Sequence, residues 1–150
     1  MLLERNILSN MKLRIFVIDD EPCITDTLNW HLSDQGHEVI CAPEPTSCSI
    51  YQGGQCDHEH PCGDILFVDK SMPKMSGLDF VEHMNKKGCK GLAQNKVVMS
   101  GALEQKDIQK ALELGCTVVH KPITLDQIDA MIEEMKKAIP SDRKLANLEP

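Results

Sequence analysis

The chain has 150 residues, of which 41% are hydrophobic and 26% charged, with a formal net charge of −7 and an isoelectric point near 5.3. This length favours one domain that is large enough to bury a full hydrophobic core. The acidic balance argues against a general nucleic-acid binder and against attachment to an anionic membrane surface, because both require clustered positive charge.

The N-terminal segment places Glu4 and Arg5 among short apolar runs. This pattern fits neither a signal peptide nor a transmembrane helix, so we expect a cytoplasmic protein with no membrane insertion and no direct contact with nucleic acid. Thiols stay reduced in that compartment, and the seven cysteines are an odd number, so a disulfide framework is not expected. Residues 1–11 are predicted to be a tail, and the original start is either Met1 or Met11.

Short apolar runs then alternate with helical patterns along the chain. The run Leu13–Asp19 is rich in β-branched residues, which is typical of a strand buried on both faces. A helix should begin at Pro22 and end at Gly36. Further strands are expected over 37–42, 64–69, 96–101 and 117–122, and further helices over 77–88, 103–115 and 124–139.

This alternation of strands and helices predicts an α/β fold with a parallel sheet covered on both faces. We expect the domain to span residues 12–139, followed by a polar C-terminal tail over residues 140–150.

One segment breaks the alternation, because the rhythm requires a helix between the strands at 37–42 and 64–69. The sequence there contains Gly53, Gly54 and Pro61, which are poor helix formers. A short helix is compatible with the sequence only over Ser47–Gln52, and the remainder should be irregular. We call residues 47–63 the Cys/His-rich loop, because it contains Cys48, Cys56, His58, His60 and Cys62.

Polar side chains follow four of the five predicted strands. The first strand ends on Asp19 and Asp20, the third on Asp69, the fourth on Ser100 and the fifth on Lys121. Each of these alone is an ordinary turn or strand exit. Ligands of open parallel sheets bind beyond the carboxyl ends of the strands, however, so the order of these residues along the chain favours one joint site.

The chemistry of this set points to phosphoryl transfer. Clustered carboxylates suit Mg²⁺, which prefers oxygen ligands and also accepts phosphate oxygens. A carboxylate can attack a phosphoryl group to form an acyl phosphate. The ammonium of Lys121 and the metal would neutralise the charge that develops on the phosphoryl oxygens.

Four stretches of the chain resemble the receiver domain of two-component response regulators, and the resemblance extends from about Lys12 to Ile139. It implies a flavodoxin-like, doubly wound, five-stranded parallel sheet with strand order 2-1-3-4-5 and helices on both faces. The matching stretches are FVIDDEP (16–22), LFVDKSMPKMSG (66–77), VVMSG (97–101) and HKPI (120–123).

The resemblance also implies a role for each residue of the candidate site. It makes Asp69 the phosphoacceptor, Asp20 a direct Mg²⁺ ligand, Asp19 a ligand through water, the backbone carbonyl of Ser71 a further ligand, Ser100 the switch hydroxyl and Lys121 the phosphate-binding lysine. A sensor histidine kinase or a phosphotransfer protein would supply the phosphoryl group. The chain would then act as a switch with intrinsic phosphorylation and dephosphorylation chemistry, rather than as an enzyme, and would signal to a downstream protein target. A homodimer is a further option.

Two features depart from the receiver pattern. Many receivers carry an aromatic residue where this chain has Val118, three residues before the lysine. The second departure is the Cys/His-rich loop, which stands in place of most of the second helix.

We predict that Cys48, Cys56, Cys62 and one of His58 or His60 bind a structural Zn²⁺, since Cys and His are its usual tetrahedral ligands. Asp57 and Glu59 would orient the histidines. The alternatives are a loop that binds no metal and a redox-sensitive Cys56–Cys62 disulfide. The other cysteines are predicted to pack as small apolar residues, namely Cys23, Cys41, Cys89 and Cys116.

Two other functions compete with the phosphoacceptor. The first is a metal or redox sensor that uses Cys48–Cys62 on a receiver scaffold. The second is a phosphatase similar to haloacid dehalogenases, which is disfavoured because the first strand carries adjacent Asp19 and Asp20 rather than D-x-D.

Overall fold

Five short strands form one parallel sheet in the computed structural model, which describes residues 11–148. The strand order is β2-β1-β3-β4-β5, as predicted. Adjacent strands pair in step, with Val17 opposite Phe67 and Val68 opposite Val98, so the carboxyl ends of β1, β3 and β4 lie at the same edge. The strands are β1 (Arg14–Ile18), β2 (Glu38–Ala42), β3 (Ile65–Asp69), β4 (Lys96–Ser100) and β5 (Thr117–His120).

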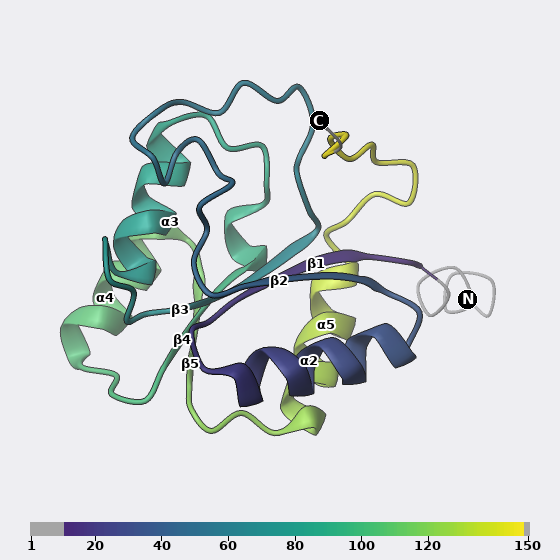
Figure 1. Ribbon diagram of the computed structural model, residues 1–150, viewed down its shortest axis with the longest axis horizontal. Helices are drawn as coiled ribbons and strands as arrows, with labels where there is room; N and C mark the ends of the chain where they lie inside the picture. Colours follow the sequence, from purple (N-terminus) through teal and green to yellow (C-terminus); the bar gives the residue numbers. More distant parts are fainter. Residues whose placement is uncertain (1–10, 149–150) are drawn as a thin grey trace.

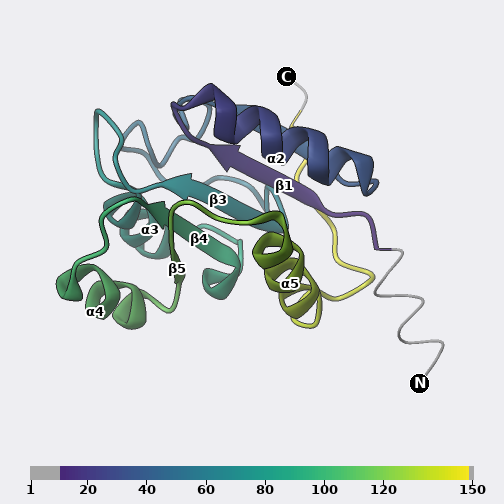
Figure 2. The same cartoon turned by 90° about the horizontal axis from the view of Figure 1, so that it is seen from below.

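Helices cover both faces of the sheet, which confirms the predicted doubly wound α/β fold. Helices α2 and α5 lie on one face, and α3 and α4 lie on the other (Figure 1; Figure 2 shows the same arrangement from below). Pro22 opens α2 as predicted, and Gly36 follows the helix with a φ of 94°. The elements are α2 (Pro22–Asp34), α3 (Gly77–Lys86), α4 (Gln105–Leu114), α5 (Leu125–Lys136) and the 3₁₀ turn η1 (Ala93–Asn95).

The sheet separates two apolar cores, because consecutive side chains of a strand point to opposite faces. Val17 lies in the core beneath α2 and α5, where it shares a cluster with Leu32 and Ile128. Ile18 lies in the opposite core beside Val68 and Val81. Burial of each large apolar side chain contributes about 1.5–3 kcal/mol, so the two cores together fix the positions of the strand ends.

The segment between β2 and β3 contains no helix in the structure. Turns occupy Thr46–Ser47 and Ser49–Gly53, so the short helix that the sequence allowed over Ser47–Gln52 does not form. Ile50 and Tyr51 are nevertheless buried on the α3 side of the sheet, and the Tyr51 ring meets the Phe80 ring edge-on at 5.6 Å. These two side chains anchor the Cys/His-rich loop in the core.

Residues 140–148 also make specific contacts with the domain. Arg143 donates hydrogen bonds to both carboxylate oxygens of Asp64, at 2.8 and 2.6 Å, and the N–H of Ala146 donates to the carbonyl of Pro61 at 2.7 Å. Arg14 donates to the carbonyl of Ala146 at 2.8 Å. The C-terminal segment therefore lies against the start of β3 and the end of the Cys/His-rich loop.

The boundaries 1–11, 12–139 and 140–150 stay a prediction, and residues 1–10 and 149–150 lie outside the described residues. Within residues 11–148, no helix is both long and apolar enough to cross a bilayer.

Two of the cysteines predicted to pack in the core are in fact exposed. Cys23 lies in the first turn of α2, and Cys41 lies on β2, which is an edge strand of the sheet. Only one side of an edge strand is covered by a neighbouring strand, so Cys41 remains in contact with solvent. Cys89 and Cys116 are partly buried and pack against the core beneath α3 and α4, as predicted.

Candidate functional site

Three carboxylates meet at the carboxyl edge of the sheet, and we call Asp19, Asp20, Asp69 and the nearby Lys121 the acidic edge. Carboxylate oxygens of Asp19, Asp20 and Asp69 all lie within 4.8 Å of one another. β1 and β3 are adjacent, so the residues that end these two strands are neighbours. Asp19 and Asp69 are buried while Asp20 is exposed, so the cluster opens to solvent on one side.

Backbone donors hold the two buried carboxylates in place. The N–H of Glu21 donates to Asp19 at 2.9 Å, and the N–H of Ser71 donates to Asp69 at 3.3 Å. Each donor lies two residues after its acceptor, at the point where the strand turns into the following loop. The turns therefore fix the orientation of the acids.

The loop that follows Asp69 leads into α3 through a very close approach at Gly77. A Cβ atom at Gly77 would lie 2.5 Å from the backbone carbonyl oxygen of Asp69, so no larger residue fits without a shift of the backbone. The N–H of Gly77 donates to the carbonyl of Lys70 at 2.8 Å. Ser76 caps α3 by accepting from the N–H of Asp79. Together these contacts seat α3 directly against the phosphoacceptor candidate.

Lys121 reaches from the end of β5 across the sheet edge to the carboxylates. Its Nζ lies 2.7 Å from Asp19, 3.2 Å from Glu21 and 3.3 Å from Asp69. Burial alone would lower the pKa of Lys121, but the hydrogen bonds to Asp19 and Glu21 and the charges of Asp19 and Asp69 raise it overall. The lysine is therefore an ammonium at neutral pH.

The pKa of Asp69 is shifted by its burial and by a neighbouring carboxylate. Burial, followed by the charge of Asp19, raises the pKa of Asp69, and the hydrogen bond from Ser71 and the charge of Lys121 only partly oppose this rise. One ammonium thus does not neutralise the clustered carboxylates. An oxygen-only donor set with excess negative charge fits a hard divalent cation such as Mg²⁺.

The two predicted serines lie near this cluster but make different contacts. Ser100 is buried at the end of β4, where its Oγ accepts from the N–H of Ala102 at 3.0 Å and its carbonyl accepts from the N–H of Lys121 at 2.7 Å. Ser71 is exposed and contacts Asp69 through its N–H. The ligand role of the Ser71 carbonyl and the switch role of Ser100 stay predictions.

An ion pair between Lys70 and Asp107 was not anticipated from the sequence. Lys70 follows the phosphoacceptor candidate, and its Nζ donates to Asp107 at 2.6 Å and to the carbonyl of Ala102 at 3.3 Å. Asp107 also caps α4 by accepting from the N–H of Glu104. The E-x-x-D spacing of a helix start could have predicted this cap. The same spacing does not predict the ion pair between Lys70 and Asp107, because the tertiary fold brings these two residues together.

The predicted zinc site of Cys48, Cys56, Cys62 and one of His58 or His60 is not supported. Within residues 11–148, the acidic cluster is the only set of three or more such side chains whose ligand atoms lie within 4.8 Å of one another. Burial of Ile50 and Tyr51 fixes the turn after Cys48, and Cys48 and Cys56 pack against the apolar core beneath α3 and α4. All seven thiols are free, so the Cys56–Cys62 disulfide is not formed either.

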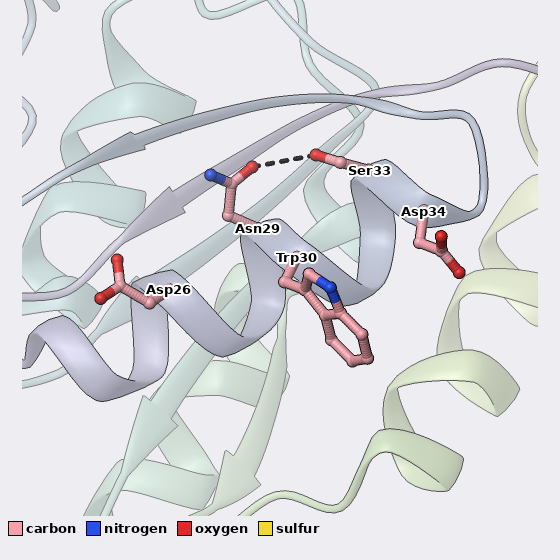
Figure 3. Close-up of a pocket in the computed structure, with 5 residues that line it drawn as sticks. All are labelled: Asp26, Asn29, Trp30, Ser33 and Asp34. Carbon is pink, nitrogen blue, oxygen red and sulfur yellow. Dashed lines mark hydrogen bonds between the residues drawn. The ribbon is translucent and has the colours of Figure 1, made fainter.

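Val118, at the position where many receivers carry an aromatic residue, is partly buried and packs against the core beneath α3 and α4. A shallow depression on α2 surrounds Trp30, whose side chain is largely exposed, and contains none of the predicted site residues (Figure 3). Its lining residues are Asp26, Asn29, Trp30, Ser33 and Asp34.

Comparison with known protein families gives one match that covers most of the chain. The family described as "Response regulator receiver domain" matches residues 15–133. The transcriptional regulatory protein KdpE of Mycobacterium tuberculosis is 30% identical over 137 residues, which cover 90% of this chain and 54% of that protein. The regulator of RpoS of Escherichia coli is 30% identical over 112 residues, which cover 73% of this chain and 30% of that protein. The chain thus spans about half or less of the length of these relatives.

Solved structures show the same fold at lower identity. A two-component response regulator from Clostridium difficile superposes with a TM-score of 0.64 at 19% identity, covering 84% of this chain and 97% of that one. The beryllofluoride-activated NtrC4 receiver domain, solved as a dimer, gives a TM-score of 0.66 at 19% identity, with 83% and 97% covered. At this identity the likeness concerns the fold alone.

Proposed function

The chain belongs to the response regulator receiver domain family, and on that premise we propose that it accepts a phosphoryl group on Asp69 with the help of Mg²⁺. The observation that carries this proposal is the position of Asp69, buried beside the Asp19 carboxylate and 3.3 Å from the Lys121 ammonium. This arrangement provides a nucleophile, an acidic metal site and a cation within one small volume.

In the proposed reaction, a carboxylate oxygen of Asp69 attacks the phosphorus of a phosphorylated donor. A new O–P bond forms while the bond from phosphorus to the donor breaks, and the donor leaves with the bonding electron pair and takes up a proton. Lys121 would pair with one phosphoryl oxygen, and the hydroxyl of Ser100 would donate to another.

The Mg²⁺ would be held by the carboxylates of Asp20 and Asp69, by Asp19 through water, and by the backbone carbonyl of Ser71. Bound there, the ion would supply positive charge to the phosphoryl oxygens. The three clustered carboxylates have one ammonium, that of Lys121, beside them, and this excess of negative charge supports the assignment.

We further propose that a sensor histidine kinase or a phosphotransfer protein is the donor and that the output is contact with a downstream protein. The chain would then be a switch rather than an enzyme with a substrate of its own. A homodimer is a second form of output, since an activated relative was solved as a dimer. The haloacid-dehalogenase-like alternative is disfavoured, because that class is similar to D-x-D at its first strand and this chain has adjacent Asp19 and Asp20 there.

The test is labelling with acetyl phosphate and Mg²⁺, followed by intact mass spectrometry. We expect the wild-type chain to gain one hydroxylamine-sensitive phosphoryl group and Asp69→Asn to gain none. The matched control is Asp57→Asn, which removes an exposed carboxylate of the Cys/His-rich loop and should label like wild type. Equal labelling of Asp69→Asn and wild type, or no labelling of wild type, would overturn the proposal.

A further inference from the structure

The first half of the loop between β4 and α4 is held by hydrogen bonds rather than by packing, and we call residues 101–104 the β4–α4 loop. Its first two residues, Gly101 and Ala102, are exposed, and a Cβ at Gly101 would meet nothing within 4 Å. Ser100, which directly precedes the loop, is only 4% exposed. The hydrogen bonds of the loop backbone therefore determine how the Ser100 side chain is held where the chain leaves the sheet.

Ala102 connects Ser100 to Lys70 through its two backbone groups. Its N–H donates to the Oγ of Ser100 at 3.0 Å, and its carbonyl accepts from the Nζ of Lys70 at 3.3 Å. The Ser100 hydroxyl thus acts as an acceptor toward the loop and keeps its own hydrogen to donate to another oxygen. Ala102 therefore bridges the residue that follows Asp69 and the hydroxyl that is proposed to contact the phosphoryl group.

The ammonium of Lys70 has a fixed position, because both ends of the residue are anchored. Its N–H continues the pairing of β3 with β4 by donating to the carbonyl of Met99 at 2.8 Å. Its Nζ lies 2.6 Å from the carboxylate of Asp107, which is buried and also accepts from the N–H of Glu104. A charged hydrogen bond to a buried acid is short and strong, so Lys70 is not a freely moving surface side chain.

A second ion pair on α4 offers a matched comparison. Lys110 pairs with Asp79 and Glu82 of α3, and within residues 11–148 it donates to no carbonyl of the β4–α4 loop. The side chains of Lys110 and Asp79 are 32% and 48% exposed, against 22% and 8% for Lys70 and Asp107. Exposed ion pairs contribute little to stability, and the Lys110 pair only joins two helices. The Lys70 pair, by contrast, also reaches the loop that holds Ser100.

We propose that Lys70 is a positioning residue for the phosphorylation of Asp69. Through the carbonyl of Ala102, it holds the Ser100 hydroxyl in the orientation from which that hydroxyl donates to the phosphoryl group. This role rests on the function proposed above for Asp69 and Ser100. Lys70 does not itself contact the phosphoryl group, because its ammonium is engaged by Asp107 and Ala102. Without it, the loop is free to move and the hydroxyl is less often in the reactive orientation.

The first test follows the loop in the absence of phosphorylation, by amide hydrogen exchange of the full chain read by NMR. We expect the N–H of Ala102 to be protected in wild type and to exchange about tenfold faster in Lys70→Met, because the loop opens more often. Lys70→Arg keeps a charged donor and should restore the protection. Lys110→Met breaks the comparison pair and should leave Ala102 protected.

The second test measures the rate at which acetyl phosphate with Mg²⁺ labels Asp69, followed by intact mass spectrometry. Lys70→Met should label about tenfold more slowly than wild type, which is less than the roughly 10²–10³-fold cost of losing such a donor outright. Lys70→Arg and Lys110→Met should label at close to the wild-type rate.

A double-mutant cycle separates an effect through Ser100 from a general effect on the fold. If Lys70 acts through the hydroxyl, Lys70→Met should slow labelling of the wild-type chain and have no further effect in Ser100→Ala. Lys70→Met also leaves the Asp107 carboxylate buried without its main partner. If that variant does not fold, the double variant Lys70→Met, Asp107→Asn removes the unpaired charge and should show the same slowing.

Three results would overturn this role. They are wild-type exchange at Ala102 in Lys70→Met, wild-type labelling in that variant, and an equal further slowing when Lys70→Met is added to Ser100→Ala. A wild-type chain that is not labelled would overturn the function proposed for Asp69 and this role with it. A labelled wild type beside an unaffected Lys70→Met would overturn the role of Lys70 alone.

Discussion

The acidic edge and the Cys/His-rich loop place their polar side chains by different means. At the acidic edge, Asp19 and Asp69 follow or end neighbouring parallel strands, and Lys121 follows the outermost one, so the sheet itself brings them together. In the loop, no strand or helix sets the positions. Cys56 is held by a single backbone hydrogen bond to Lys87, and the turn after Cys48 is held by the burial of Ile50 and Tyr51.

This difference implies that the acidic edge serves the chemistry of the domain, whereas the Cys/His-rich loop serves its stability. The carboxylates repel one another and are partly desolvated, as the raised pKa of Asp69 shows, so the acidic edge is maintained by the rest of the fold. The loop contributes large buried side chains to the core and should therefore support stability. Changes at the acidic edge should mainly alter phosphorylation, and changes in the loop should mainly alter the free energy of unfolding.

The largest expected stability effect in this comparison comes from Tyr51→Ala. Tyr51 is 1% exposed and packs edge-on against Phe80, so its truncation leaves a cavity and should lower the free energy of unfolding by about 3–5 kcal/mol. Chemical denaturation measures this loss, and acetyl phosphate should still label Asp69. Tyr51→Phe is the control and should cost less than about 1 kcal/mol, because it removes only the long 3.4 Å hydrogen bond to Glu44. Loss of labelling in a folded Tyr51→Ala variant would contradict the division.

A smaller effect is expected where the C-terminal segment meets the loop. The Asp64 side chain is 2% exposed, and Arg143→Ala would remove both of its arginine side-chain hydrogen bonds and leave the N–H of Arg14, at 2.9 Å, as the donor that the structure of residues 11–148 shows. We expect a loss of about 2–3 kcal/mol in denaturation experiments. Arg143→Lys keeps the charge but loses the bidentate hydrogen bonding to Asp64. Its free energy of unfolding should lie between those of wild type and Arg143→Ala. A loss below about 0.5 kcal/mol in Arg143→Ala, the range of an ordinary surface change, would show that residues 140–148 form a tail, in agreement with the predicted boundary.

The smallest effect concerns the ion pair that adjoins the acidic edge. The hydrogen bond from Lys70, followed by that from the N–H of Glu104, lowers the pKa of Asp107 in the folded state. Its stabilising contribution is therefore fully present above the unfolded-state pKa of about 3.9 and is lost as the pH falls through the lower folded-state value. Asp107→Asn should cost about 1–2 kcal/mol at pH 7, and the difference from wild type should shrink in strongly acidic solution. A difference that does not change with pH would rule out the charge as its source.

Much of the acidic edge could be predicted from the sequence, because strand ends are visible in it. The β-branched run before Asp19 and the apolar run before Asp69 fixed where each strand stops, and parallel pairing then required the acids to meet. The contact from Lys70 to Asp107 could not be predicted in this way. It joins a loop to a helix across 37 residues and depends on how α4 packs.

For the Cys/His-rich loop, the local backbone conformation could be predicted from the sequence, but the tertiary contacts could not. The absence of a regular helix could be predicted from Gly53, Gly54 and Pro61, and the structure agrees. The contact that Cys56 makes could not be predicted, because its N–H donates to the carbonyl of Lys87 in a distant part of the sequence. The end of α3 brings Lys87 to the loop, and only the folded chain carries that information.

The close approach of Gly77 to Asp69 also limits which substitutions the chain can tolerate. A side chain at position 77 would collide with the backbone of Asp69, whereas one at Gly101, which follows Ser100, would meet nothing within 4 Å. Random mutagenesis with selection for signalling should therefore recover substitutions at Gly101 and almost none at Gly77. Gly77 and Gly101 thus differ in how well they tolerate substitution. The close packing of α3 against the end of β3 is the reason that position 77 must remain glycine.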